Sequence, residues 1–541
     1  ATLREYESDN PDHTRRRIVY EPFLTKSYDE NDTDPASPCF NTPIIHYTDG
    51  LGRLVQVDEN THLNDDGTPS GSLSTWTTRY DYDLNDQLTR ITDSQNNVKW
   101  FEYDGLKRNI FMNDVDRGVM YYVYDEASNL IETRDAKNQR ITFTFDGANR
   151  MLTEDYHDEG LPFSANYAFN PAAPLSRSNR PDVAYFYDVP VPGLDQGDTT
   201  TATAHNTRGM LAYVWDLSGE EHTSHDARGR VEYIVKRIPD PMFYPTLQGS
   251  NAPVNPQLVS YKTAFGYDSM DRTIRLVYPD NDEVTYEYNE RGLLKRIRGG
   301  PNGSIISNLL YHPSSQQAQI DYGNGVRTTH DYDNRLRLSK LFTFRTQPST
   351  NDLQLIHFTY DFDDVSNIRQ ITDNRPSPSV PDGDKRRNTQ AYRYDDLYRL
   401  TRVQYSFNLP GAAQRNDGEI NYYYDRIGNM LSQTSDIQHY KNCLSVTQIG
   451  DLGYGGSAGR FARTGRPTGA PPGPHALTSV SQLATNNPQP RIYPYDANGN
   501  MLDIDGLACT WDFKDSLVRA QDNTPLRRFS GDFSLGRIKV K

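Results

Sequence analysis

A seven-residue pattern returns along the chain, and its spacing limits the possible folds more than any other feature. An aromatic residue is followed by Asp, a short polar stretch and an aliphatic residue, as in "YDEASNL" (124–130), "YDRIGNM" (424–430) and "YDANGNM" (495–501). The aromatic residue returns every 21 residues from Tyr82 through Phe145. A fixed period of this length predicts a repeat protein built from one supersecondary unit.

Each position of the pattern has a physical reason. A second aromatic residue often stands two positions earlier, as Tyr80 does before Tyr82, and this spacing puts both rings on one face of a strand. The Asp can accept hydrogen bonds from the backbone N–H groups that follow it, which starts a turn. Gly, Asn, Asp or Ser usually stands four positions after the aromatic residue, where a tight hairpin demands positive φ. The aliphatic residue two positions later begins the next strand, so the unit is strand, turn, strand.

We expect the recurring residues to be a structural framework, because catalysis needs one constellation whereas a scaffold needs copies. The framework comprises Tyr82, Asp83, Tyr103, Asp104, Tyr124, Asp125, Phe145, Asp146, Tyr267, Asp268, Tyr288, Tyr332, Asp333, Tyr394, Asp395, Tyr424, Asp425, Gly428, Tyr495, Asp496, Gly499 and Trp511.

The array predicts an all-β fold made of one long antiparallel ribbon. A hairpin is not stable alone in water, so neighbouring hairpins must pair edge to edge. About fifteen units give roughly thirty strands, and at ~4.8 Å per strand the ribbon would run on the order of 140 Å. Because strands twist, such a ribbon must coil. We therefore expect a wall that spirals into a hollow shell.

The composition agrees with half-buried strands. Only 35% of the 541 residues are hydrophobic, whereas tyrosines number 37. Each aromatic side chain can bury roughly 150–250 Å², and we expect tyrosine to keep its polar tip in water. No run of about 18 apolar residues exists, which predicts no membrane span. The net charge of -15 disfavours nucleic acid as a partner, because phosphate binding needs a concentrated basic face.

Residues 1–44 lack the pattern and are interpreted as an N-terminal lead-in segment, followed by the repeat shell over 45–541. Four stretches interrupt the array, near 160–203, 239–257, 373–388 and 450–490, and are rich in Pro, Gly and polar residues. Such stretches favour long loops or insertions over separate domains. The polar N-terminus is not a signal peptide. We expect either a segment that starts inside a longer protein or an export route that leaves no such mark.

Candidate reactive groups are few. Cys39, Cys443 and Cys509 lie far apart and predict buried thiols, without a disulfide framework or a zinc site. His222 and His225 precede Asp226, but His225-Asp226 stands where Tyr-Asp stands elsewhere, and residues three apart on a strand face opposite ways. Acidic clusters such as "NDDGT" lack the spacing of a calcium loop and fit turn caps. No nucleophile, metal or phosphate-loop motif occurs, so we expect no enzyme, no metal and no cofactor.

The repeated "YDxxG(N/R)(L/M)" units resemble RHS repeats, also called YD repeats, over roughly residues 45–530. The stretches "HYTDGLGRLVQVDE" (46–59) and "YPYDANGNMLDIDGLACTWDFKDSLV" (493–518) are similar to bacterial RHS proteins related to insecticidal toxin-complex and SpvB-type proteins. The resemblance implies a β-strip that spirals into a cocoon around an unfolded or partly folded toxin. In animal teneurins a related shell serves cell–cell adhesion.

The resemblance also sets expectations for function. Family toxins usually end the shell with a "DPxGxxxG"-type segment that cleaves itself; no such segment follows Trp511, so no self-cleavage site carries over. We expect a piece of a larger polypeptide or one chain of an assembly, secreted or on the bacterial cell surface. Its predicted role is to shield a toxin or other protein cargo, and its partners would be that cargo and other parts of the toxin assembly. The alternative is an adhesion module of the teneurin type.

Overall fold

The computed structural model describes residues 4–157, 181–216, 219–239, 258–300, 303–346, 354–376, 379–380, 387–408, 414–435, 452–455, 473–480, 491–504 and 506–522. Over these residues the protein is almost entirely β, and the one α-helix among them is α1 (Glu30–Thr33). Thirty-one strands form one sheet, and three small sheets of two or three strands accompany it. The predicted all-β fold with one long antiparallel sheet is therefore confirmed.

The chain divides into two compact units, each described by itself: unit 1 is Ala1–Gly118 with Asn308–Gly499, and unit 2 is Val119–Ser307 with Asn500–Lys541. The first strands of unit 1 are β1 (Arg4–Asp9), β2 (Arg15–Glu21), β3 (Leu24–Tyr28), β4 (Ile44–Thr48), β5 (Leu54–Leu63), β6 (Pro69–Tyr82), β7 (Leu88–Thr92), β8 (Val98–Tyr103) and β9 (Asn109–Asp114). Its later strands are β25 (Gln317–Tyr322), β26 (Val326–Tyr332), β27 (Leu338–Arg345), β28 (Gln354–Phe362), β29 (Ile368–Asp373), β30 (Asn388–Tyr394), β31 (Leu400–Asn408), β32 (Gln414–Tyr424), β33 (Met430–Ser435), β34 (Leu452–Tyr454), β35 (Leu477–Val480) and β36 (Arg491–Ile492).

Unit 2 holds the middle of the array and the last described strands. They are β10 (Gly118–Tyr124), β11 (Leu130–Arg134), β12 (Arg140–Phe145), β13 (Met151–Asp155), β14 (Val183–Tyr187), β15 (Leu194–Asp195), β16 (Thr201–Ala202), β17 (Leu211–Asp216), β18 (Gly219–His225), β19 (Val231–Pro239), β20 (Leu258–Tyr267), β21 (Thr273–Val277), β22 (Glu283–Tyr288), β23 (Leu294–Arg298), β37 (Asp503–Ile504), β38 (Leu507–Trp511) and β39 (Leu517–Asp522). Strand β24 (Ile306–Tyr311) spans the boundary between the units.

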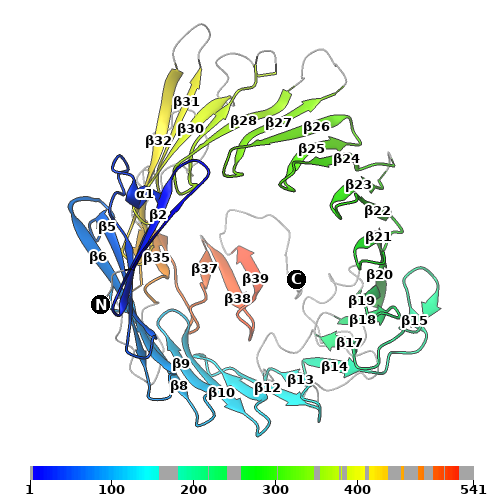
Figure 1. Cartoon of the computed structure of the whole chain (residues 1–541). Coiled ribbons are helices and arrows are strands. Elements are labelled where there is room, and N and C mark those ends of the chain that lie inside the picture. The colour runs from blue at the N-terminus through cyan, green and yellow to red at the C-terminus, as the bar shows by residue number, and fades with distance from the viewer. Residues whose placement is uncertain are drawn as a thin grey trace. The chain divides into compact units, whose positions relative to one another are not determined.

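The large sheet is a meander in which strands that are neighbours in sequence pair antiparallel, as β10 with β11 and β11 with β12. The exception is β14, which pairs with β17, because the short β15–β16 hairpin lies between them in sequence. Figure 1 shows strands of unit 2 following one another in chain order. The large sheet is therefore a long strip of strands, and its turns alternate between the two edges of that strip. We call the edge with the turns after the motif aromatics the Tyr-Asp edge, and the other one the opposite edge.

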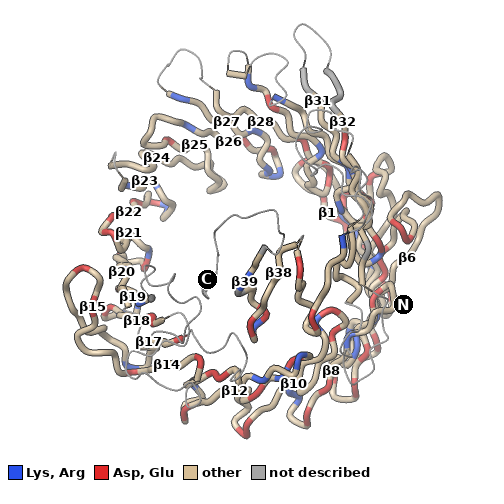
Figure 2. Tube along the Cα trace, turned by 180° about the vertical axis from the view of Figure 1, so that it is seen from behind, with Lys and Arg blue, Asp and Glu red and all other residues tan. Residues whose placement is uncertain are grey.

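A single layer of sheet buries few side chains completely, and most strand residues are only partly buried. Two small clusters in unit 2 are exceptions: one contains Ile141, Tyr156 and Val183, and the other contains Tyr233 and Val235. Figure 2 shows acidic and basic residues interspersed along the strip, without one broad basic face. No helix within the described ranges is long and apolar enough to cross a membrane.

The predicted lead-in and insertions are more structured than loops where the structure describes them. Within residues 1–44, β1, β2 and β3 pair in order and join the large sheet through β4. The stretch 160–203 contains β14 and the β15–β16 hairpin, and its residues 160–180 lie outside the described part. The stretch 450–490 contains β34 and β35. Residues 240–257 lie outside the described ranges, and the described residues between 373 and 388 connect β29 to β30.

Candidate functional site

The repeated turn is a five-residue loop closed by the same hydrogen bonds in most copies. After Tyr103, the N–H of Asp104 donates to the carbonyl of Arg108 at 3.0 Å. One carboxylate oxygen of Asp104 accepts from the N–H groups of Leu106 at 2.9 Å and Arg108 at 3.0 Å. The backbone N–H of Arg108 is the main cause that lowers the pKa of Asp104. Lys107, four positions after Tyr103, has a φ of 66°, as the pattern predicts for this position.

Most hairpins at motif turns also carry a β-bulge that the sequence analysis did not foresee. Tyr82 pairs with Leu88 but Asp81 pairs with Arg90, so β7 has one extra residue between its two partners. A bulge interrupts the ladder and leaves a backbone group without its strand partner. The hydroxyl of Tyr103, the motif aromatic of the next unit, donates to the carbonyl of Leu88 at 2.9 Å. The repeat therefore supplies its own partner for the bulged carbonyl.

This tyrosine bond recurs through both units. Tyr82, Tyr267, Tyr288, Tyr332, Tyr394, Tyr424, Tyr454 and Tyr495 donate to the carbonyls of Leu54, Val231, Thr273, Gln317, Ile368, Leu400, Met430 and Leu477. In the last repeat the indole N–H of Trp511 donates to the carbonyl of Met501 at 2.7 Å in the same way. The sequence analysis did not foresee that these tyrosine hydroxyls donate to backbone carbonyls.

An arginine five positions after the aromatic residue connects one repeat to the next. Nε of Arg272 donates to Asp268 at 2.7 Å, and its guanidinium carbon lies 4.5 Å from the ring centroid of Tyr288. Burial opposes the charge of Asp268, but the hydrogen bonds from Arg272 outweigh it and lower the pKa of the carboxyl. The same stacking joins Arg53, Arg150, Arg230, Arg337 and Arg399 to Tyr82, Tyr187, Tyr267, Phe362 and Tyr424. The recurrence of Arg at this position was the sequence signal that could have revealed this contact between neighbouring repeats.

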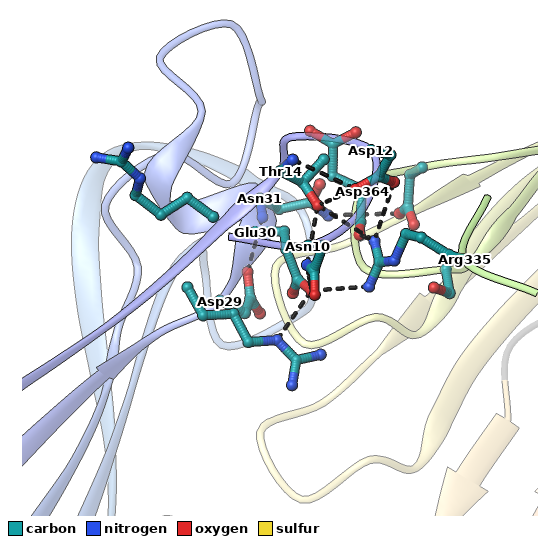
Figure 3. Close-up of polar contacts among 12 residues, drawn as sticks. Asn10, Asp12, Thr14, Asp29, Glu30, Asn31, Arg335 and Asp364 are labelled. Carbon is teal, nitrogen blue, oxygen red and sulfur yellow. Dashed lines mark hydrogen bonds and ion pairs between the residues drawn. The ribbon is translucent and has the colours of Figure 1, made fainter. Parts of the chain in front are cut away.

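Unit 1 brings two distant parts of the strip together. The first strip, β1–β9, presents its opposite edge to the Tyr-Asp edge of the second strip, β25–β33. We call the contact between these two edges the seam. Figure 3 shows one end of the seam, where the β1–β2 turn and α1 meet the turn after β26. Glu30 of α1 is only 1% exposed and its carboxylate lies 2.8 Å from Arg335. The same oxygen accepts from Asn10 at 2.7 Å and lies 2.8 Å from Arg16.

The α1 segment carries a second set of seam contacts. Asp29 caps the helix in a reciprocal capping box with Asp32, and the hydroxyl of Tyr398 donates to the Asp29 carboxylate. Asp32 accepts from the N–H of Thr42 at 3.0 Å and from its hydroxyl at 2.8 Å. Burial, and then the charge of Asp29, raise the pKa of Asp32 to about 6. The first strip therefore holds a carboxyl that gains its proton close to neutral pH.

The seam continues turn by turn toward the end of the first strip. Asp396 accepts hydrogen bonds from the backbone N–H of His62 and, at 3.2 Å, from the hydroxyl of Thr61. A side chain at Gly67 would overlap the backbone carbonyl of Tyr424, so this contact needs glycine. Further along, Arg426 binds Asp65, Gln95 donates to Asp425, and His475 donates to Asp116. The strips thus stack edge on edge, with turns facing turns.

The seam does not assemble a reactive centre. Cys39 lies beside Asp396, but burial is the main cause that raises the pKa of its thiol, and a protonated thiol is a poor nucleophile. Nδ1 of His62 is 3.2 Å from Asp396, so the histidine pairs with the carboxylate. No group of three or more His, Cys, Asp or Glu side chains in the described ranges could hold a metal ion.

His222 and His225 in unit 2 are both buried, at 2% and 7% exposure. Nε2 of His222 lies 2.9 Å from Glu220, and its ring stacks on Tyr213 with centroids 5.0 Å apart. Glu220 also pairs with Arg237 at 2.8 Å. His222 therefore belongs to a buried ion-pair cluster within the strands.

The last described hairpin, β38–β39, packs its turn against the strip of unit 2. Phe513 stacks on Tyr156 with ring centroids 6.2 Å apart and joins the Ile141 cluster. The ammonium of Lys514 pairs with Glu154, which also accepts from the hydroxyl of Tyr185 at 2.7 Å. Asp515 of the same turn lies 3.5 Å from the ammonium of Lys137, so the turn is held by one apolar contact and two ion pairs.

Comparisons with known proteins agree with this geometry. No family model matches the chain. It is 28% identical over 168 residues to the toxin subunit YenC1 of Yersinia entomophaga, which covers 27% of this chain and 17% of the relative. It is 22% identical over 298 residues to YenC2 of the same organism, covering 46% of this chain and 31% of the relative. The crystal structure of TcdB2-TccC3-TEV superposes with a TM-score of 0.72 at 18% identity, over 98% of this chain and 24% of that chain.

The RHS, or YD, repeat family fits this chain. A second solved structure, the Photorhabdus luminescens Tc holotoxin pore, superposes with a TM-score of 0.69 at 18% identity over 96% of this chain and 24% of that one. The chain therefore spans under a third of its curated relatives and about a quarter of the solved chains. The likeness to the solved structures shows the fold, and the two named relatives are toxin subunits.

Proposed function

We propose that this chain is part of an RHS-repeat shell that encloses and shields protein cargo, such as a toxin domain. The observation that carries the proposal is the seam of unit 1. A strip that stacks its opposite edge on its own Tyr-Asp edge becomes a continuous wall. A single-layer wall has little interior of its own, so its two faces are free for other contacts.

The contacts themselves suit a scaffold. In most motif turns an aspartate caps the backbone, and in the turn after Tyr288 this role falls to Asn289. The described residues offer neither a metal cluster nor an activated nucleophile. The proposed role is therefore not enzymatic and needs no cofactor. Similarity to YenC1 and YenC2, which are toxin subunits, supports a place in a secreted, multi-chain toxin assembly. An adhesion role of the teneurin type has no comparable support among these relatives.

Limited proteolysis with mass spectrometry on the full-length native protein tests the proposal. We expect a fragment from beyond the repeat region to stay uncut until the shell is denatured. Arg335→Glu would place a negative charge beside buried Glu30 and Asp12 and open the seam, so it should expose the fragment to protease. Lys295→Glu makes the same charge change on an exposed strand residue and should leave the fragment protected.

The proposal fails if the fragment is cut as fast in the native protein as in the denatured one. It also fails if Arg335→Glu and Lys295→Glu behave alike while thermal melts show that Arg335→Glu has loosened unit 1.

A further inference from the structure

One turn of the first strip holds the segment 473–480, which contains β35. The turn lies between β9 and β10, and Asp116 stands in its middle. One carboxylate oxygen of Asp116 accepts from the N–H of His475 at 2.9 Å, and the other lies 2.7 Å from Nδ1 of the same residue. The N–H groups of Asp116 and Arg117 donate to the Asp114 carboxylate at 2.9 and 3.1 Å. The turn itself is therefore fixed, and it presents Asp116 to the segment.

Close backbone packing accompanies this side-chain contact. A Cβ at Gly473 would overlap the carboxylate of Asp116, and a Cβ at Gly499 would overlap its backbone carbonyl. Beside them, the side-chain amide of Asn429 donates to the carbonyl of Pro474 at 2.9 Å. The contact thus combines backbone fit with hydrogen bonds from two side chains, which distinguishes it from an ordinary surface ion pair.

The imidazole of His475 lies among carboxylates from three turns of unit 1. Asp116 belongs to the β9–β10 turn, Asp93 to the β7–β8 turn and Asp425 to the β32–β33 turn. The hydrogen bond to Asp116 raises the pKa of His475, burial opposes this effect, and the charges of the three aspartates add to it. The side chain is 48% exposed, so protons from the solvent reach it.

Permanent cations on the same turns and strands are engaged elsewhere or fewer than the acids. Lys99 of β8 pairs with Asp114 at 2.8 Å, and Arg426 pairs with Asp65. Arg117 is the remaining cation of the β9–β10 turn. The histidine therefore stands against Asp116 in surroundings where carboxylates outnumber permanent cations, and its own charge state matters to the contact.

We propose that His475 and Asp116 form a proton-dependent latch that holds the segment 473–480 on the β9–β10 turn. The protonated imidazole gives Asp116 a charge-assisted hydrogen bond, whereas the neutral ring donates from Nδ1 in only one tautomer and without charge. Because the pKa is raised above 6.5, the contribution of the latch is complete below about pH 6.5 and is lost as the pH rises through the raised value. The latch goes beyond the proposed function and stands whether or not the wall encloses cargo.

Exchange of the imidazole C2 proton with deuterium tests the charge state. The rate of this exchange follows the pKa of each histidine, and mass spectrometry reads it in the full-length native protein. We expect a pKa above 6.5 for His475. Asp116→Asn keeps an acceptor for the backbone N–H but removes the charge, so it should lower this pKa. A pKa at or below the ordinary value in the native chain overturns the proposal.

Amide hydrogen exchange tests the latch itself. Protection of the 475–480 amides, corrected for the direct effect of pH on exchange, should fall by about threefold between about pH 6 and about pH 8.5. His475→Gln cannot gain a proton there and should show the low protection at both pH values. His13→Gln is the matched control, because His13 is an exposed histidine of the same unit, and it should keep the native pH dependence. The proposal fails if native protection does not change with pH, or if His475→Gln retains the change.

Discussion

At the scale of single residues, the repeat is stabilised by contacts that run forward from one unit to the next. Arg272 binds its own aspartate and covers the ring of Tyr288, whose hydroxyl then donates back to the carbonyl of Thr273. An exposed ion pair alone contributes little, typically under about 1 kcal/mol. Each repeat depends on its neighbour, because the ion pair, the stacking of the arginine on the next aromatic ring and the hydrogen bond from that ring's hydroxyl act together.

Removing one tyrosine hydroxyl should expose that dependence. Tyr288→Phe leaves the ring in place but deprives the Thr273 carbonyl of a donor at 2.8 Å. We expect the free energy of unfolding to fall by about 1–2 kcal/mol in urea titrations. Tyr278→Phe removes a hydroxyl from a ring that is 43% exposed and should change it by less than about 0.5 kcal/mol. Equal effects of the two substitutions would contradict a stabilising role for the hydrogen bonds from the motif tyrosines to the backbone carbonyls.

The turn after Tyr332 is one of several in which a side chain other than glycine stands at positive φ. Leu336 stands at the fourth position after Tyr332 with a φ of 63°, and it is 53% exposed. A side chain in this region costs roughly 1–2 kcal/mol, which glycine avoids at a smaller entropic cost. Leu336→Gly should therefore raise the free energy of unfolding by up to about 1 kcal/mol, measured by urea titration. Gly428→Leu makes the reverse change at the same position of another unit and should lower it; a gain there would refute the argument.

At the scale of elements, the sequence predicts what is local and periodic. The aromatic that ends each strand, the aspartate that caps each turn and the positive φ four positions on all follow from residue chemistry. The β-bulges and the strands that lack the motif depend on geometry that the sequence of a single repeat does not reveal. The bulge shifts the register by one residue, and the strands of residues 4–28 join the sheet without the motif, because pairing with a neighbour suffices.

The β38–β39 hairpin is anchored to the rest of unit 2 through the side chains of its turn. Lys514→Met should free its turn from Glu154 while Phe513 stays packed, because the ionic contact is lost and the stacking remains. We expect hydrogen exchange of the β38–β39 amides to speed up by about tenfold, with little change elsewhere in the unit. Lys295→Met should leave exchange in this hairpin unchanged. Faster exchange across all of unit 2 would mean that Lys514 has a wider structural role.

At the scale of the whole molecule, the seam could not be read from the sequence. Glu30 and Arg335 are 305 residues apart, and nothing in the local pattern of either one marks the other as its partner. The sequence did indicate that a long twisted strip must coil. It could not indicate which turns would meet, since that depends on twist summed over many strands and bulges.

The α1 segment should make the stability of unit 1 depend on pH through Asp32. Its pKa is raised from 3.8 to about 6, so the folded state holds a proton that the unfolded chain has already lost between these values. The contribution of Asp32 to stability is therefore greatest below about pH 4 and declines as the pH rises to about 6. Asp32→Asn should remove this decline in urea titrations across pH 4–7. Glu5→Gln, on exposed β1, is the control, and identical pH profiles for Asp32→Asn and the native chain would contradict the assignment.

The great separation along the chain of the seam residues also fixes an order of events during synthesis. Neighbouring hairpins can pair as soon as they leave the ribosome, because their contacts are local and close quickly. Glu30 leaves the ribosome before Arg335, which follows 305 residues later, so the contact between the two side chains must wait for that turn. A nascent chain that stops short of that turn holds an open strip in which Glu30 has only its local partners Asn10 and Arg16. Translation therefore decides when the two strips can meet, and the α1 segment is locked in place only after the much later turn that holds Arg335 has been made.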